Sequence, residues 1–121
     1  MAIVKVTPEL VEAALRGTDW AAIDALYAAL ERIQPSPVVT LNRAVATAKV
    51  RGCEAALDMI TPLEERLSGY FHYFGARGAF LQQLGRLAEA RVAFDRAIAL
   101  ANTPAEAAHI RRHLDRLMRA G

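Results

Sequence analysis

Two histidines four residues apart are the side chains of this chain whose spacing most resembles a catalytic or metal-binding pattern. His109 and His113 have the interval that places two imidazoles on one face of a helix, as in helices that bind zinc. The intervening Ile110, Arg111 and Arg112 supply no glutamate as general base, and two guanidinium groups repel a cation. We therefore predict a basic contact surface at this position and no metal site.

Little else in the sequence suggests catalysis. Cys53 is the single cysteine, there are three histidines, and the sequence has no glycine-rich phosphate loop, nucleophile elbow or paired carboxylates beside a base. One cysteine excludes an internal disulfide and is typical of a reducing compartment. We expect a protein that is not an enzyme, uses no cofactor and is cytoplasmic.

The composition fits one globular domain of 121 residues, with 54% hydrophobic and 23% charged residues. A formal net charge of +2 is too small to demand nucleic acid as a partner. No apolar run approaches the roughly 20 residues that cross a bilayer, so we expect no membrane contact.

An interval of 34 residues organises the chain, and it is the tetratricopeptide period. Small and large residues recur at this interval in two series: Ala22, Ala56 and Ala90, and Leu26, Ile60 and Phe94. A helix pair of this kind cannot bury its apolar stripe alone, so copies stack on one another. We predict an all-α fold, a tetratricopeptide-like superhelix of about three antiparallel helix pairs plus a C-terminal capping helix.

Capping residues and helix breakers set the predicted boundaries. A single domain spans 1–121, with repeats at about 7–34, 36–68 and 70–102 and a capping helix at 104–119. The helices of the repeats are expected at about 8–16, 20–33, 38–50, 54–67, 70–84 and 87–101. Pro62 should kink or split the fourth of them. Gly78 should let two helices approach closely.

Five consecutive aromatic or histidine residues begin the fifth predicted helix. Phe71 and Phe74 share one side and should belong to the core. Tyr70, His72 and Tyr73 are then candidates for a protein-contact patch, because aromatic residues are enriched at interfaces. Alternatively, these side chains simply cover the surface between repeats.

The first helix of each pair lines the concave groove in tetratricopeptide folds. The helical register places Asn42, Lys49, His72 and Gln82 toward that groove. Their donors suit the backbone or the carboxylates of a bound partner. The alternative is that they are ordinary solvated polar residues.

Arg43 and Arg77 lie one or two positions from apolar core residues, so their guanidinium groups should be half-buried and need acceptors. We expect these acceptors among three carboxylates of the neighbouring helix: Asp58, Glu64 and Glu65. The preferred interpretation is an ion pair between helices, and the alternative is that both arginines contact a partner.

Three strings resemble one protein family: TDW at 18–20, PSPVVTLNRAVA at 35–46 and GYFH at 69–72. They are similar to the C-terminal extension of bacterial RNA polymerase sigma factors of the extracytoplasmic-function (ECF) type, from about residue 18 to the end. The resemblance implies a regulatory protein-interaction domain that lacks the DNA-binding sigma domains. Its partners would be those sigma domains of the parent protein, core RNA polymerase, or both, without direct contact to nucleic acid.

Two other functions stay open. The chain would be a stand-alone tetratricopeptide adaptor or peptide-binding scaffold if no sigma domains belong to it. A third hypothesis, ranked last because the basic cluster is small, is a nucleic-acid accessory domain that uses Arg111, Arg112 and Arg116.

Overall fold

The computed structural model describes residues 19–120, and within this range the chain consists of helices joined by short turns and loops, without strands. The elements are α2 (Trp20–Ile33), α3 (Pro37–Arg51), α4 (Cys53–Ile60), the 3-10 helix η1 (Thr61–Leu63), α5 (Phe71–Gln83), α6 (Leu87–Leu100) and α7 (Pro104–Ala120). The predicted all-α class is therefore confirmed for these residues. The helix expected at about 8–16 lies outside them.

Side-chain caps begin three of the helices where the sequence predicted helix starts. The Asp19 carboxylate accepts from the Ala22 N–H at 3.1 Å, and the Ser36 hydroxyl accepts from the Val38 N–H at 3.3 Å. At the start of α7 the hydroxyl of Thr103 accepts from the N–H of Glu106 at 3.1 Å. The carboxylate of Glu106 in turn accepts from the backbone N–H of Asn102 at 2.8 Å. Each contact satisfies an N–H group that has no partner inside the helix.

The helix predicted at 54–67 is wrong beyond Ile60. As expected, Pro62 splits it: α4 ends at Ile60, η1 follows, and residues 64–69 form turns. Proline has no N–H to donate and its ring clashes with the carbonyl four residues earlier, so the α-helical pattern stops. The hydroxyl of Thr61 donates to the Leu57 carbonyl at 2.8 Å, and the same carbonyl also accepts from the backbone N–H of Thr61.

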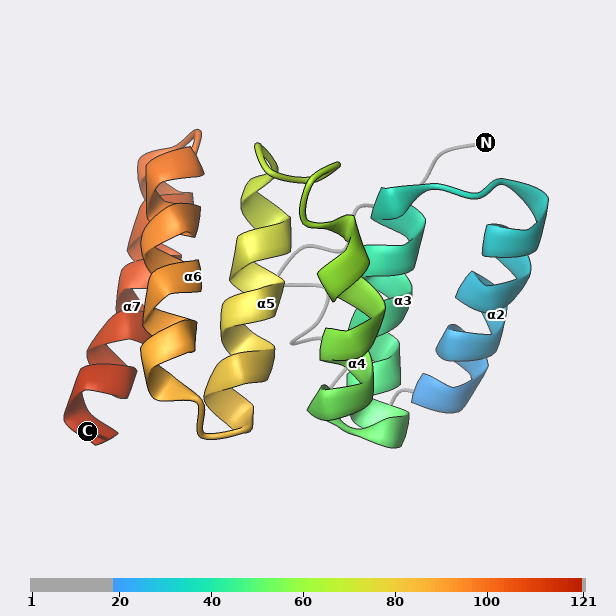
Figure 1. Ribbon diagram of the computed structural model, residues 1–121, viewed down its shortest axis with the longest axis horizontal. Helices are drawn as coiled ribbons and strands as arrows, with labels where there is room; N and C mark the ends of the chain where they lie inside the picture. The colour runs from blue at the N-terminus through green and yellow to red at the C-terminus, as the bar shows by residue number, and fades with distance from the viewer. Residues whose placement is uncertain (1–18, 121) are drawn as a thin grey trace.

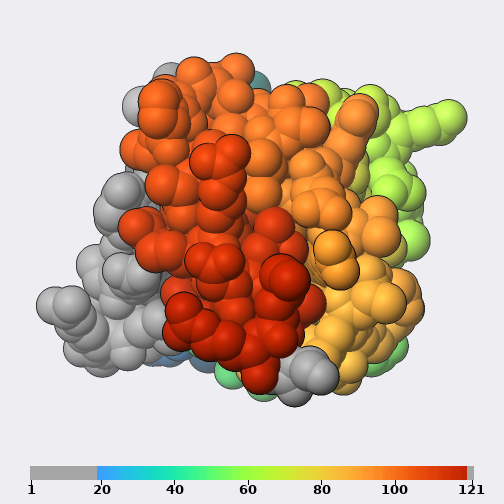
Figure 2. All heavy atoms as spheres, turned by 90° about the vertical axis from the view of Figure 1, so that its left-hand side faces the viewer, coloured from blue at the N-terminus to red at the C-terminus, as the bar shows by residue number. Residues whose placement is uncertain are grey.

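The helices stand side by side in one row, and successive helices run antiparallel (Figure 1). Each helix packs mainly on its neighbours in sequence, and in addition α3 contacts α5 and α5 contacts α7. Figure 2 shows α7 crossing the C-terminal end of the row in front of α6. The three helices α3, α5 and α7 therefore share one side of the row.

The core runs through the row as one cluster of apolar side chains. Phe94, Ile60 and Leu81 have no exposed surface, and Phe71 and Phe74 are buried as predicted. A Cβ atom on Gly78 would lie 2.5 Å from the Phe94 ring. The prediction that Gly78 permits a close helix approach is thus confirmed, because α5 and α6 could not stand this close with any side chain there.

Replacing Gly78 should therefore test the packing of α5 on α6. Gly78→Ala should lower the free energy of unfolding by about 1–3 kcal/mol, since overpacking against a buried ring outweighs the gain in helix propensity. Denaturant unfolding followed by circular dichroism measures it. Gly75→Ala is the matched control, because its Cβ would meet only Ile110 at 3.6 Å. A stabilising Gly78→Ala would contradict the packing described here.

Candidate functional site

A groove of about 660 Å³ opens on the side of the row that α3, α5 and α7 share. Side chains of these three helices line it, together with Cys53 at the start of α4, and we call it the α3–α5–α7 groove. Its floor is apolar, formed by buried side chains such as Leu41, Phe71 and Ile110. A volume of this size is typical of sites that bind a ligand, where an apolar surface surrounds a few polar groups.

Asn42 provides the polar group deepest in the groove wall. The residue is 7% exposed, and its amide nitrogen Nδ2 has no hydrogen-bond partner in the described part of the chain. A buried donor without an acceptor costs about 1–3 kcal/mol. Within residues 19–120 this nitrogen therefore has its donor capacity open to an acceptor that enters the groove.

Four residues that the sequence predicted as contacts line this one groove. Asn42 and Lys49 come from α3, while His72 and Gln82 come from α5. Asn42 and Lys49 are seven residues apart, which returns them to nearly the same side of α3. His72 and Gln82 border one broad face of α5 through Gly75 and Ala79, at steps of three and four residues. The structure thus brings these four predicted residues together.

Sequence reasoning missed the third wall of the groove. His109, His113 and Arg116 of α7 line it, and His113 stacks on the Phe94 ring with 5.4 Å between centroids. Their spacing of four and three residues on one helix was visible in the sequence. The direction in which α7 packs could not be seen in the sequence. A separate basic surface was therefore predicted for these side chains.

Cys53 lies at the edge of the groove with a thiol that is poorly suited to nucleophilic chemistry. Burial raises the pKa of the Cys53 thiol, and the neighbouring charge of Lys49 only partly offsets this effect. The thiol therefore stays protonated near neutral pH, whereas reactive cysteines have a lowered pKa.

Tyr73 is not a surface residue, and its prediction as a contact is wrong. Its side chain has no exposed surface, and its hydroxyl donates to the Ile60 carbonyl at 3.0 Å. Burial raises the pKa of this phenol above its usual value. Tyr73 therefore fastens α5 to α4. Tyr70 is half-buried at the start of α5, with its ring edge against His72 at 5.3 Å between centroids.

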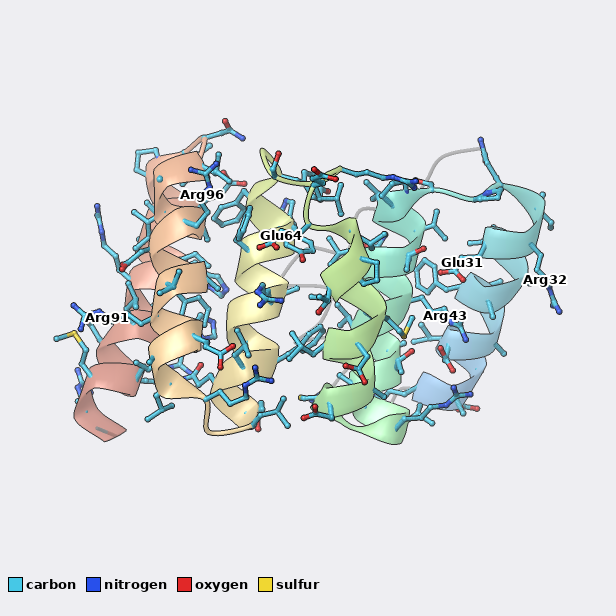
Figure 3. All side chains as sticks on the ribbon, viewed as in Figure 1. Glu31, Arg32, Arg43, Glu64, Arg91 and Arg96 are labelled. Carbon is cyan, nitrogen blue, oxygen red and sulfur yellow. The ribbon has the colours of Figure 1, made fainter. Side chains whose placement is uncertain are left out.

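Arg43 binds two carboxylates of α2, and the acceptors predicted for it, Asp58, Glu64 and Glu65, are wrong. Its guanidinium donates to Asp24 and to Glu31, both at 3.1 Å, as Figure 3 shows for Glu31. The hydroxyl of Thr47 donates to the same carboxylate of Asp24 at 3.0 Å. Burial lowers the pKa of Arg43, but the hydrogen bonds to Asp24 and Glu31 outweigh it. The side chain holds α2 on α3 and does not face the groove.

Arg77 lies away from the α3–α5–α7 groove. It borders a second, shallower hollow between the turn at 64–69 and α6, together with Glu64, Glu89, Phe74 and Arg96. Its Nη1 is buried without a hydrogen-bond partner in the described residues. Glu64, one of the predicted acceptors, therefore borders the same hollow without binding this nitrogen. The guanidinium of Arg96 lies 5.8 Å from the centroid of the Phe74 ring.

Between residues 19 and 120, no helix has the length and apolarity that a membrane span requires. In the same range, no three side chains of histidine, cysteine, aspartate or glutamate are grouped as metal ligands would be.

Comparison with known proteins finds a relative of unknown role. An uncharacterized protein of Rhizobium meliloti (strain 1021) is 69% identical over 100 residues, which are 83% of this chain and 24% of the relative. The chain thus spans about a quarter of the length of the curated relative it matches. No protein-family model matches the sequence. No solved structure is similar to it.

Removing Arg43 should test the contact between α2 and α3. Arg43→Gln should lower the free energy of unfolding by about 1–3 kcal/mol, because Asp24 is buried and loses its charged partner. Thermal or urea unfolding measures it. Arg86→Gln is the control, since its pair with Glu89 is exposed and should contribute little. Equal effects of the two substitutions would contradict a structural role for Arg43.

Proposed function

We propose that this chain is a regulatory protein-interaction domain with a tetratricopeptide-like superhelix, and that it binds a protein segment in the α3–α5–α7 groove. The observation that carries the proposal is the buried amide of Asn42, which lines the groove and has no partner in the described chain. A group that costs stability in the empty domain is explained if an occupant supplies its acceptor.

The repeat architecture is supported by equivalent positions of the 34-residue period. Ala56 and Ala90 have no exposed surface, and neither do Ile60 and Phe94. The contacts of α3 with α5 and of α5 with α7 follow the stacking of first helices in such repeats. Leu26, the earliest member of the series, is 60% exposed. The first helix predicted for its pair lies outside the described residues.

The sigma-factor role is supported by the resembling strings. Asp19 caps α2, Ser36 caps α3, and Arg43 joins the two helices. Asp19, Ser36 and Arg43 therefore stabilise the fold, whereas Asn42 and His72 of the same strings line the groove. The Rhizobium relative is about four times as long as the matched region, which fits a domain of a larger protein.

In this role the domain acts by contact and not by chemistry. Its groove would hold or release the DNA-binding domains of an ECF-type sigma factor, or assist their engagement with core RNA polymerase during transcription initiation. The alternative, a stand-alone tetratricopeptide adaptor, uses the same groove for unrelated proteins. The two are distinguished by whether a component of the transcription machinery binds.

A direct binding experiment tests the transcription role. The tagged chain should retain sigma domains of an ECF-type factor from the same genome, or core RNA polymerase, at roughly micromolar concentrations, since the groove presents one modest contact area. Pull-down followed by titration measures this. Absence of binding to either, with transcription unchanged when the chain is added, would remove the sigma-factor role and favour the adaptor.

Substitution of Asn42 tests the groove itself. Asn42→Leu removes the unpartnered donor, so the free energy of unfolding should stay unchanged or rise by up to about 1–3 kcal/mol. Binding of the partner found above should weaken by about tenfold, because a hydrogen bond in the complex is lost. Unfolding and titration of the same variant give both numbers. A destabilised Asn42→Leu variant would show instead that the amide serves the fold.

A further inference from the structure

The described residues that line the α3–α5–α7 groove carry permanent charge of one sign. Lys49 at the end of α3 and Arg116 on α7 are exposed cations on opposite walls. Among the described residues that line the groove, none is aspartate or glutamate. Carboxylates of the described chain lie on other surfaces, for example Asp58 on α4, Glu64 in the turn and Asp95 on α6. The groove therefore presents positive potential to whatever enters it.

The floor between these cations is apolar and partly made of small residues. Gly75, Ala76 and Ala79 of α5 line it beside Ala48 of α3. Small side chains let another backbone approach the helices closely. Asn42, on the wall that α3 forms, has an amide nitrogen without an acceptor in the described chain, and a peptide backbone or a carboxylate can supply one.

From these features we infer that the occupant of the groove is an acidic protein segment. An oxygen of the segment accepts from Asn42 Nδ2, its apolar side chains rest on the floor, and its carboxylates lie near Lys49 and Arg116. This inference rests on the proposed protein-binding function and specifies the chemistry of the partner. Complementary charge of this kind raises the association rate and excludes basic segments.

A nucleic acid fits the groove less well. Only Lys49 and Arg116 provide permanent positive charge among its described lining residues, whereas affinity for a phosphate backbone grows with the number of phosphates neutralised. The other arginines of α7, Arg111, Arg112 and Arg119, are exposed but do not line the groove. The groove also combines an apolar floor with one amide donor, a combination suited to a polypeptide.

Two fluorescent peptides of equal length test the inference on the full chain. One alternates glutamate with leucine, and its counterpart carries glutamine at every glutamate. The acidic peptide should bind about tenfold more tightly by fluorescence anisotropy, and this preference should shrink as ionic strength rises from roughly 50 to 300 mM. The double variant Lys49→Gln/Arg116→Gln should lose most of the preference. Arg111→Gln/Arg119→Gln removes the same charge outside the groove and should keep it.

The outcomes separate this inference from the proposed function. The inference of an acidic segment is wrong if both peptides bind with equal affinity. It is also wrong if the two double variants lose the preference for the acidic peptide to the same extent. A sigma or polymerase component could bind with the same affinity to the unchanged chain and to the Lys49→Gln/Arg116→Gln variant. In that case the proposed function stands and this inference is wrong. A single-stranded oligonucleotide could bind more tightly than the acidic peptide, with an affinity that Lys49→Gln/Arg116→Gln reduces. That result would contradict the inference of an acidic segment and favour nucleic acid as the occupant.

Discussion

The contact between the Phe94 ring and Gly78 determines the geometry of the C-terminal half of the molecule. Because Gly78 has no side chain, α6 stands close enough to α5 for the ring to be completely buried. The same ring stacks against His113 and so also positions α7. Two walls of the α3–α5–α7 groove, α5 and α7, are therefore spaced by one aromatic side chain that does not itself line the groove.

The contact between α2 and α3 is held in part by polar side chains. Asp24 accepts hydrogen bonds from both Arg43 and Thr47, so two residues of α3 are fixed to α2. Asn42 and Lys49 lie on another face of α3 and line the groove. One helix thus separates a face that contacts α2 from a face that lines the groove, although Asn42 and Arg43 are adjacent in the sequence. This division explains why neighbouring polar residues have different roles here.

Local chemistry made much of the fold predictable, while long-range packing limited the rest. The helix starts at Asp19 and Thr103 were visible because a cap acts on its own helix. The burial of Tyr73 against α4 depends on how the helices are placed in space. The same is true of the carboxylates that bind Arg43. The α3 and α5 residues of the groove followed from periodicity, but its α7 wall required the packing of His113 on Phe94.

The amide nitrogen of Asn42, which has no partner among residues 19–120, has an evolutionary consequence under the proposed function. A residue that lowers the stability of the empty domain would be kept only while selection acts on something other than folding, since most proteins lie just above the stability they need. In a lineage that has lost the partner, drift would be free to install leucine or methionine at this position. The identity of residue 42 in each descendant would then indicate whether its groove still binds a partner.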